Sequence, residues 1–174
     1  MRSIVITLIA VAIGCGGDAA RPDRPALPGD QRDRSIEENR SAIRLEERDI
    51  DLYERRYGYT TTATGRGVRI AMVRDVDGAN ARNDQWATIN YRVELLNGDT
   101  AYATGPGKPE SFLIGMDDVE SGLHEGVQFL SPGDSAVLII PSYRAHGLLG
   151  DSDKIPMRST VIYHIGLVKV SDRR

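Results

Sequence analysis

The spacing of apolar residues changes near Gly67, and from there on it fits strands better than a helix. In the segment 86–95, apolar side chains occupy every second position from Ala87 to Leu95, which is typical of a strand with one buried face. Asn97 and Gly98 follow at once and favour a tight hairpin turn. Further strands are predicted at 67–74, 111–114, 135–140 and 160–170.

One short helix interrupts this series of strands. Val119, Leu123, Val127 and Leu130 recur at the spacing of one buried helical face. Five strands with one inserted helix fit an antiparallel sheet that curls over the helix. The sequence therefore predicts an α+β domain over residues 64–171.

A separate amphipathic helix is predicted at 35–58. Ser35 and Glu38 form a capping box, and Gly58 is a suitable stop. Apolar residues recur every seventh position, at Ile36, Ile43, Ile50 and Tyr57, while the acidic run at 46–51 is expected on the solvated face. The narrow apolar stripe either docks on the domain, which is the favoured interpretation, or pairs with a second copy as a dimer stalk.

The first 14 residues are interpreted as a lipoprotein signal peptide. Arg2 provides a positive end, and the apolar segment 4–13 is shorter than the roughly 20 residues of a spanning helix. The residues 12–15, Ala-Ile-Gly-Cys, resemble a bacterial lipobox. Cys15 is the only cysteine of the chain, so we expect it to accept lipid. The alternative is an ordinary secretory peptide with an incidental cysteine.

Residues 15–34 are predicted to be a flexible tether, because they are rich in Pro, Asp, Arg and Ala and poor in bulky apolar residues. Gly16 stands where inner-membrane retention signals usually have an aspartate. We therefore expect a cell-envelope lipoprotein in the outer membrane, facing the periplasm.

The net charge and the spacing of the histidines argue against a nucleic-acid-binding surface and a metal site. The formal net charge is −3, with both signs interspersed, which argues against a nucleic-acid partner. His124, His146 and His164 form no i, i+4 pair, so no metal site is expected. The segment 75–78, Asp-Val-Asp-Gly, has the wrong spacing for a calcium loop and is interpreted as a polar hairpin turn.

The segment 141–163 resembles the closing part of FKBP-type peptidyl-prolyl isomerases. In that family a strand ends in Pro-Ser, a flap closes with Ile-Pro, and the last strand begins Thr-Val and carries an aromatic residue. Here the matching residues are Pro141, Ser142, Ala145, His146, Gly147, Ile155, Pro156, Thr160, Val161 and Tyr163. Upstream, matching positions are Tyr91, Leu95, Gly98, Phe112, Gly115, Val119, Gly122, Leu123, Glu125, Gly126, Pro132 and Gly133. The Gly-Asp insert after His146 is most similar to gliding-motility-associated FKBP lipoproteins.

The resemblance implies a fold and a site. The implied fold is a curled five-stranded sheet around a short helix, and the implied reaction is rotation about an X-Pro amide, which needs an apolar groove and no cofactor. Catalytic positions carried over from the family are Tyr91, Phe112 and Tyr163. Substrate-binding positions are Tyr102, Val119, Glu120, Leu123, His146 and Ile155.

Several pocket positions depart from the family pattern, so a wider and more polar groove is expected. The departures are Leu123 for an indole floor, Ala101-Tyr102 for a Phe-Asp pair, Glu110 for a wall phenylalanine, Glu120 for an isoleucine whose backbone N–H donates, and His146 for a flap tyrosine. Glu120 can still donate through its backbone, but high activity and tight macrolide binding are not expected.

Two functions follow from this reading. The first is a membrane-anchored isomerase of weak activity that assists the folding of exported proteins at X-Pro bonds. The second is a non-catalytic lipoprotein module that holds proline-containing segments of an envelope or motility complex. In both, the partners are proline-containing polypeptide segments and a membrane reached through lipidated Cys15.

Overall fold

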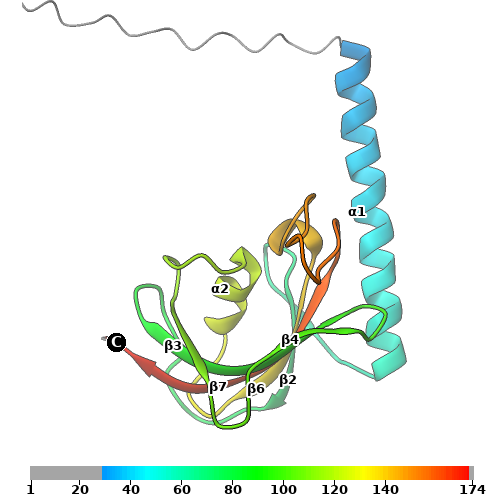
Figure 1. Cartoon of the computed structure of the whole chain (residues 1–174). Helices are drawn as coiled ribbons and strands as arrows, with labels where there is room; N and C mark the ends of the chain where they lie inside the picture. The colour runs from blue at the N-terminus through cyan, green and yellow to red at the C-terminus, as the bar shows by residue number, and fades with distance from the viewer. Residues whose placement is uncertain (1–28, 173–174) are drawn as a thin grey trace, which may run out of the picture.

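A single antiparallel sheet organises the computed structural model, which describes residues 29–172. Its strands are β1 (Thr62–Ala63), β2 (Arg69–Arg74), β3 (Trp86–Leu95), β4 (Thr100–Ala103), β5 (Glu110–Leu113), β6 (Ser135–Ile140) and β7 (Val161–Ser171). The helices are α1 (Gly29–Tyr57), α2 (Ser121–Val127) and the 3₁₀ turn η1 (Ser142–Arg144). The prediction of an α+β fold is confirmed (Figure 1).

The strand order is β1-β2-β6-β7-β3-β4, and β5 also pairs with β3. The long central pair of β3 and β7 runs from Trp86 opposite Ser171 to Leu95 opposite Val161. The free edge of β3 pairs with β5 near its start and with β4 near its end. The strands β1 and β4 are additions to the five predicted, since a two-residue strand and a four-residue hairpin arm carry little periodic signal.

The short helix α2 covers the inner face of the sheet. Leu123 and Val127 are buried there with Leu138 of β6 in the main hydrophobic core. Gly122 and Gly126 allow this close packing, because a Cβ at either position would collide with the side chain of Ile140 or Leu138.

The second half of α1 packs against one part of the outer face of the sheet. Ile50 and Tyr53 are buried there in a smaller core with Ala71, Val137 and Ile162. Docking of the helix on the domain is thus confirmed for this half. The first half rises beyond the domain (Figure 1), and Ile36 and Ile43 of the predicted stripe are 40% and 41% exposed. Tyr57, the last residue of the stripe, is also half exposed.

Carboxylates strengthen the docking of α1, so the prediction that the acidic run 46–51 lies on the solvated face is wrong for Glu46 and Asp51, although Glu47 and Asp49 are exposed. Glu46 accepts hydrogen bonds from the backbone N–H of Ser142 at 2.6 Å, the Ser142 hydroxyl at 3.0 Å and the Thr160 hydroxyl at 2.6 Å. Asp51 pairs with Arg69 at 2.6 Å. These partners lie more than 15 residues away, so the local sequence pattern could not indicate them.

The bounds of α1 also differ from the prediction. The helix begins at Gly29, upstream of the predicted cap at Ser35, so the last part of the predicted tether is helical. It ends at Tyr57 as expected, with Gly58 at a φ of 70°. The predicted signal peptide and Cys15 lie outside the described residues. Across residues 29–172 we find no helix with the length and apolar character needed to cross a membrane.

Candidate functional site

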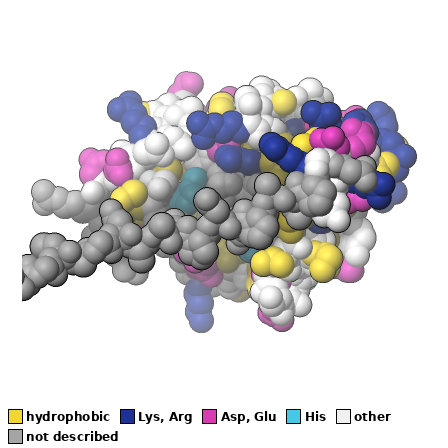
Figure 2. Space-filling model, turned by 90° about the horizontal axis from the view of Figure 1, so that it is seen from above, with side chains coloured by type: hydrophobic (Ala, Val, Ile, Leu, Met, Phe, Trp, Pro, Cys, Tyr) yellow, Lys and Arg dark blue, Asp and Glu magenta, His cyan; other side chains and the backbone are white. Residues whose placement is uncertain are grey.

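A groove of about 520 Å³ opens between the first turn of α2, the strands β3, β4 and β7, and the loop that follows η1. We call this loop, residues 145–159, the flap. The groove is lined by Tyr91, Tyr102, Asp118, Val119, Glu120, Ser121, Leu123, Ala145, His146 and Tyr163. Seen from above, the molecule shows a histidine beside hydrophobic side chains, with acidic and basic side chains interspersed around them (Figure 2).

Most of the predicted site residues meet in this groove. Tyr91 and Tyr163 lie side by side on β3 and β7, with ring centroids 5.7 Å apart. The predicted substrate-binding residues Tyr102, Val119, Glu120, Leu123 and His146 all line the groove.

Phe112 and Ile155 do not line the groove. They are 6% and 2% exposed and belong to the main core, where the Phe112 ring packs edge-on against His124. Sequence reasoning missed two lining residues with polar side chains, Asp118 and Ser121.

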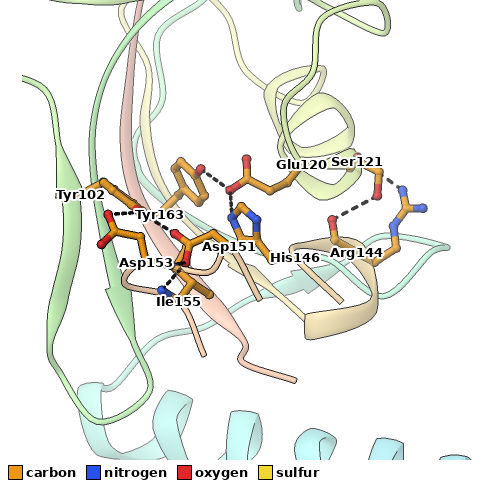
Figure 3. Close-up of polar contacts among 9 residues, drawn as sticks. All are labelled: Tyr102, Glu120, Ser121, Arg144, His146, Asp151, Asp153, Ile155 and Tyr163. Carbon is orange, nitrogen blue, oxygen red and sulfur yellow. Dashed lines mark hydrogen bonds and ion pairs between the residues drawn. The ribbon is translucent and has the colours of Figure 1, made fainter. Parts of the chain in front are cut away.

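Glu120 joins two walls of the groove. Its Oε1 accepts a hydrogen bond from the Tyr163 hydroxyl at 2.7 Å and lies 2.9 Å from Nε2 of His146 (Figure 3). The Glu120 side chain is only 10% exposed. Because a carboxylate can only accept, the imidazole donates through Nε2. The first turn of α2 is thus connected both to β7 and to the start of the flap.

A second contact fastens the far part of the flap to β4. The Tyr102 hydroxyl donates to Oδ2 of Asp151 at 2.5 Å (Figure 3). The other oxygen of Asp151 accepts the backbone N–H groups of Asp153 at 2.9 Å and Ile155 at 2.8 Å. The ammonium of Lys154 lies 4.8 Å from the centre of the Tyr102 ring. Asp151 therefore both shapes the turn that leads to Ile155 and ties that turn to the groove wall.

The ionisation of these groups follows from the same contacts. Burial, and then the nearby Glu120 carboxylate, raise the pKa of Tyr163 far above its ordinary value. Burial and the hydrogen bond to Glu110 raise the pKa of Tyr91 to about 12. Burial alone would raise the pKa of Asp151, but the Tyr102 hydroxyl and the two backbone N–H groups hold it well below its usual value. The phenols therefore stay protonated and Asp151 stays ionised at neutral pH.

The backbone of the flap is closed on itself. The N–H of Arg158 donates to the carbonyl of Gly147 at 2.9 Å, and the N–H of Asp151 donates to the carbonyl of Ile155 at 3.1 Å. Gly150 has a φ of 70° and lies so close to Ile155 that a Cβ would collide with its carbonyl oxygen. These contacts give the flap a defined shape above the groove.

The groove combines an aliphatic floor, aromatic walls and carboxylates. Leu123 is buried at its base, and Tyr163 is 5% exposed. Such walls can remove water from an apolar ligand segment, while the polar groups fix its orientation.

Comparisons with known proteins are consistent with this arrangement. The family model for FKBP-type peptidyl-prolyl cis-trans isomerases matches residues 78–168. The peptidyl-prolyl cis-trans isomerase Fkbp12 of Drosophila melanogaster is 34% identical over 106 residues, which cover 60% of this chain and 98% of that protein. A probable FKBP-type isomerase FkpA of Neisseria meningitidis is 29% identical over 113 residues, or 65% of this chain.

The chain spans only part of some relatives. It matches 40% of the length of the Neisseria protein and 27% of FK506-binding protein 4 of Rhizopus delemar. Among solved structures, a peptidyl-prolyl cis-trans isomerase of Pseudomonas syringae superposes with a TM-score of 0.65 at 22% identity, over 76% of this chain and 95% of that one. FkpA of Escherichia coli gives a TM-score of 0.64 at 21% identity, over 86% and 76% of the two chains.

Proposed function

Because the chain belongs to the FKBP-type peptidyl-prolyl cis-trans isomerase family, we propose that it turns X-Pro bonds of exported proteins and so assists their folding. The observation that carries this proposal is the groove, in which Tyr91, Tyr163 and Leu123 converge within the matched residues. The role in export rests on the signal peptide and lipobox predicted in residues 1–15.

The groove can lower the barrier to rotation without a nucleophile. Rotation about the X-Pro amide crosses a barrier of about 18–20 kcal/mol, which comes from the loss of amide resonance. The twisted amide is less dipolar than the planar one. A dry wall of Tyr91, Leu123 and Tyr163 therefore favours the twisted amide over the planar amide more than water does. A hundredfold acceleration requires about 2.7 kcal/mol of such differential binding.

The polar departures in the groove support a weak activity. Leu123 offers a smaller apolar floor than the indole that the family resemblance leads one to expect. The ring N–H of His146 donates to Glu120, so it is engaged before a ligand arrives. A ligand carbonyl must then compete with a carboxylate for this donor, which reduces the gain from binding.

The test is a proline-limited refolding assay together with a short Xaa-Pro peptide assay, both with the full chain in detergent. We expect acceleration above background at micromolar protein, and a further increase in Leu123→Trp. A flat response in both assays, with the variant also silent, would exclude the isomerase.

A non-catalytic module that holds proline-containing segments is the second candidate. The observation that favours it is the set of polar contacts across the groove, since Glu120 already bridges Tyr163 and His146. In this case Tyr91→Ala lowers peptide affinity while the wild type shows no turnover. The Gly-Asp insert in the flap supports a narrower proposal, a part in a motility complex, which deletion of the gene tests through cell movement.

The proposed anchor is a lipid on Cys15 that holds the domain at the outer membrane, on its periplasmic face. We expect the protein to fractionate with membranes and to incorporate a palmitate analogue. Cys15→Ser should remain unprocessed or become soluble in the periplasm. An unlabelled wild-type protein would refute the lipid anchor and leave the enzymatic proposal intact.

A further inference from the structure

The hydroxyl protons of the three tyrosines in the groove are all engaged by carboxylates. The pairs are Tyr91 with Glu110 at 2.9 Å, Tyr102 with Asp151 at 2.5 Å, and Tyr163 with Glu120 at 2.7 Å. Figure 3 shows the last two pairs, with Tyr102 on β4 and Tyr163 on β7. A phenol that has given its only proton to a carboxylate offers a ligand only its lone pairs.

The imidazole of His146 extends this pattern. It donates through Nε2 to Glu120, so in the neutral ring Nδ1 is an acceptor. The side chains in the walls therefore present mainly acceptors to a ligand. A ligand group that brings N–H donors gains hydrogen bonds there, whereas one that brings only acceptors loses its water without compensation.

The charges around the groove also favour a ligand that brings positively charged hydrogen-bond donors. Asp118 lies on the wall, is exposed, and has no hydrogen-bond or ion-pair partner within residues 29–172. Asp153 lies 3.3 Å from the Tyr102 hydroxyl. Lys154 is the cation placed over that ring, while Arg144, which does not line the groove, is paired with Glu125 at 2.6 Å.

We infer that the groove prefers proline-containing segments with a lysine or arginine next to the proline. This inference rests on the proposed function and specifies its substrate class. A basic neighbour supplies the donors that the phenol oxygens and carboxylates can accept, and it is attracted by Asp118 and Glu120. An acidic neighbour meets like charge and finds few side-chain donors, so its segment binds less well.

The experiment compares three peptides of the form Ala-Xaa-Pro-Phe with lysine, leucine or glutamate as Xaa, using the full chain in detergent. At low salt we expect kcat/KM for the lysine peptide to exceed that for the glutamate peptide about tenfold, since attraction and repulsion at partly exposed sites contribute about threefold each. At about 1 M salt the lysine-to-glutamate ratio of kcat/KM should fall towards the value expected for a groove without charges, because the Debye length is then only about 3 Å.

Two matched variants locate the effect. Asp118→Asn removes a wall charge that makes no internal contact, and it should reduce the lysine-to-glutamate ratio about threefold. Glu94→Gln removes the same charge at a residue of β3 that contacts Arg92 and His164 and does not line the groove, so it should leave the ratio unchanged. Glu120→Gln is a second groove variant if Asp118→Asn is poorly expressed.

The outcomes separate this inference from the proposed function. Acceleration of all three peptides with a ratio below about twofold, or a ratio that salt and Asp118→Asn leave unchanged, overturns the charge preference and keeps the isomerase. If no peptide is accelerated, fluorescence anisotropy of the same labelled peptides measures the preference for a binding module. Equal affinities then overturn the inference, and no binding at all overturns both.

Discussion

Glu46 offers a direct test of the junction between α1 and the flap. Its carboxylate accepts three hydrogen bonds, from the backbone and hydroxyl of Ser142 and from the hydroxyl of Thr160. Ser142 lies just after β6 and Thr160 just before β7, so these residues stand at the two ends of the segment that contains the flap. Glu46→Ala removes all three bonds at once.

The expected loss follows from burial. Ser142 is 8% and Thr160 2% exposed, so water does not readily replace the carboxylate at either residue. A hydrogen bond to a charged acceptor contributes about 1.5–3 kcal/mol, and bonds to one shared acceptor are not additive. We therefore expect Glu46→Ala to lower the free energy of unfolding by about 3–5 kcal/mol. With a urea m-value of about 2 kcal/mol/M for a domain of this size, the midpoint falls by about 1.5–2.5 M.

Urea denaturation followed by circular dichroism measures this shift, and Glu47→Ala is the matched control. Glu47 is the next residue of α1, is exposed, and should change the midpoint little. A midpoint for Glu46→Ala within about 0.5 M of that of Glu47→Ala would refute the argument that this carboxylate holds the flap.

Three further predictions concern the flap and the core. Tyr102→Phe loses the hydrogen bond to Asp151, so the peptide KM should rise about threefold and amide exchange in residues 147–157 should become faster. Gly150→Ala should destabilise the flap in the same exchange measurement, because φ is 70° and the new Cβ would collide with Ile155. Burial alone would raise the pKa of Asp134, but hydrogen bonds from two backbone N–H groups hold that pKa below its usual value. The stabilisation by the ionised carboxylate is therefore present above about pH 3.9 and is lost as the pH falls through the folded pKa. The urea midpoint of Asp134→Asn should accordingly vary less between pH 4 and 2 than that of the wild type.

The fold could be predicted from local patterns wherever burial repeats along the chain. The alternation in 86–95 gave β3 its bounds, and Asn97-Gly98 gave the hairpin, in which Gly98 has a φ of 95°. The start of α1 could not be predicted from Ser35 and Glu38, because the same residue types also occur inside exposed helices, and Gln31 and Arg32 extend the helix without difficulty. The role of Glu46 depends on residues 96 and 114 positions away, which no local pattern reports.

The site could be predicted only where the family resemblance has a matching position. The groove brings Tyr91, Tyr163 and Leu123 together as expected. Asp151 comes from the Gly-Asp insert of the flap, so neither periodicity nor the resemblance indicated that it would bind Tyr102. The sequence feature that could have indicated this role is the position of Asp151 four residues before Ile155, in a loop that must turn back on itself.

The contacts of the flap argue that α1 belongs to the same folded unit as the groove. Glu46 of α1 binds both ends of the segment that contains the flap. Glu120 binds His146 near the start of the flap, and Tyr102 binds Asp151 in its turn. A helix that served only as a spacer ahead of the domain would not need the three hydrogen bonds of Glu46 and would not bury Ile50 against the sheet. The shape of the groove therefore depends on residues far upstream of the part of the chain that matches the family model, which begins at residue 78.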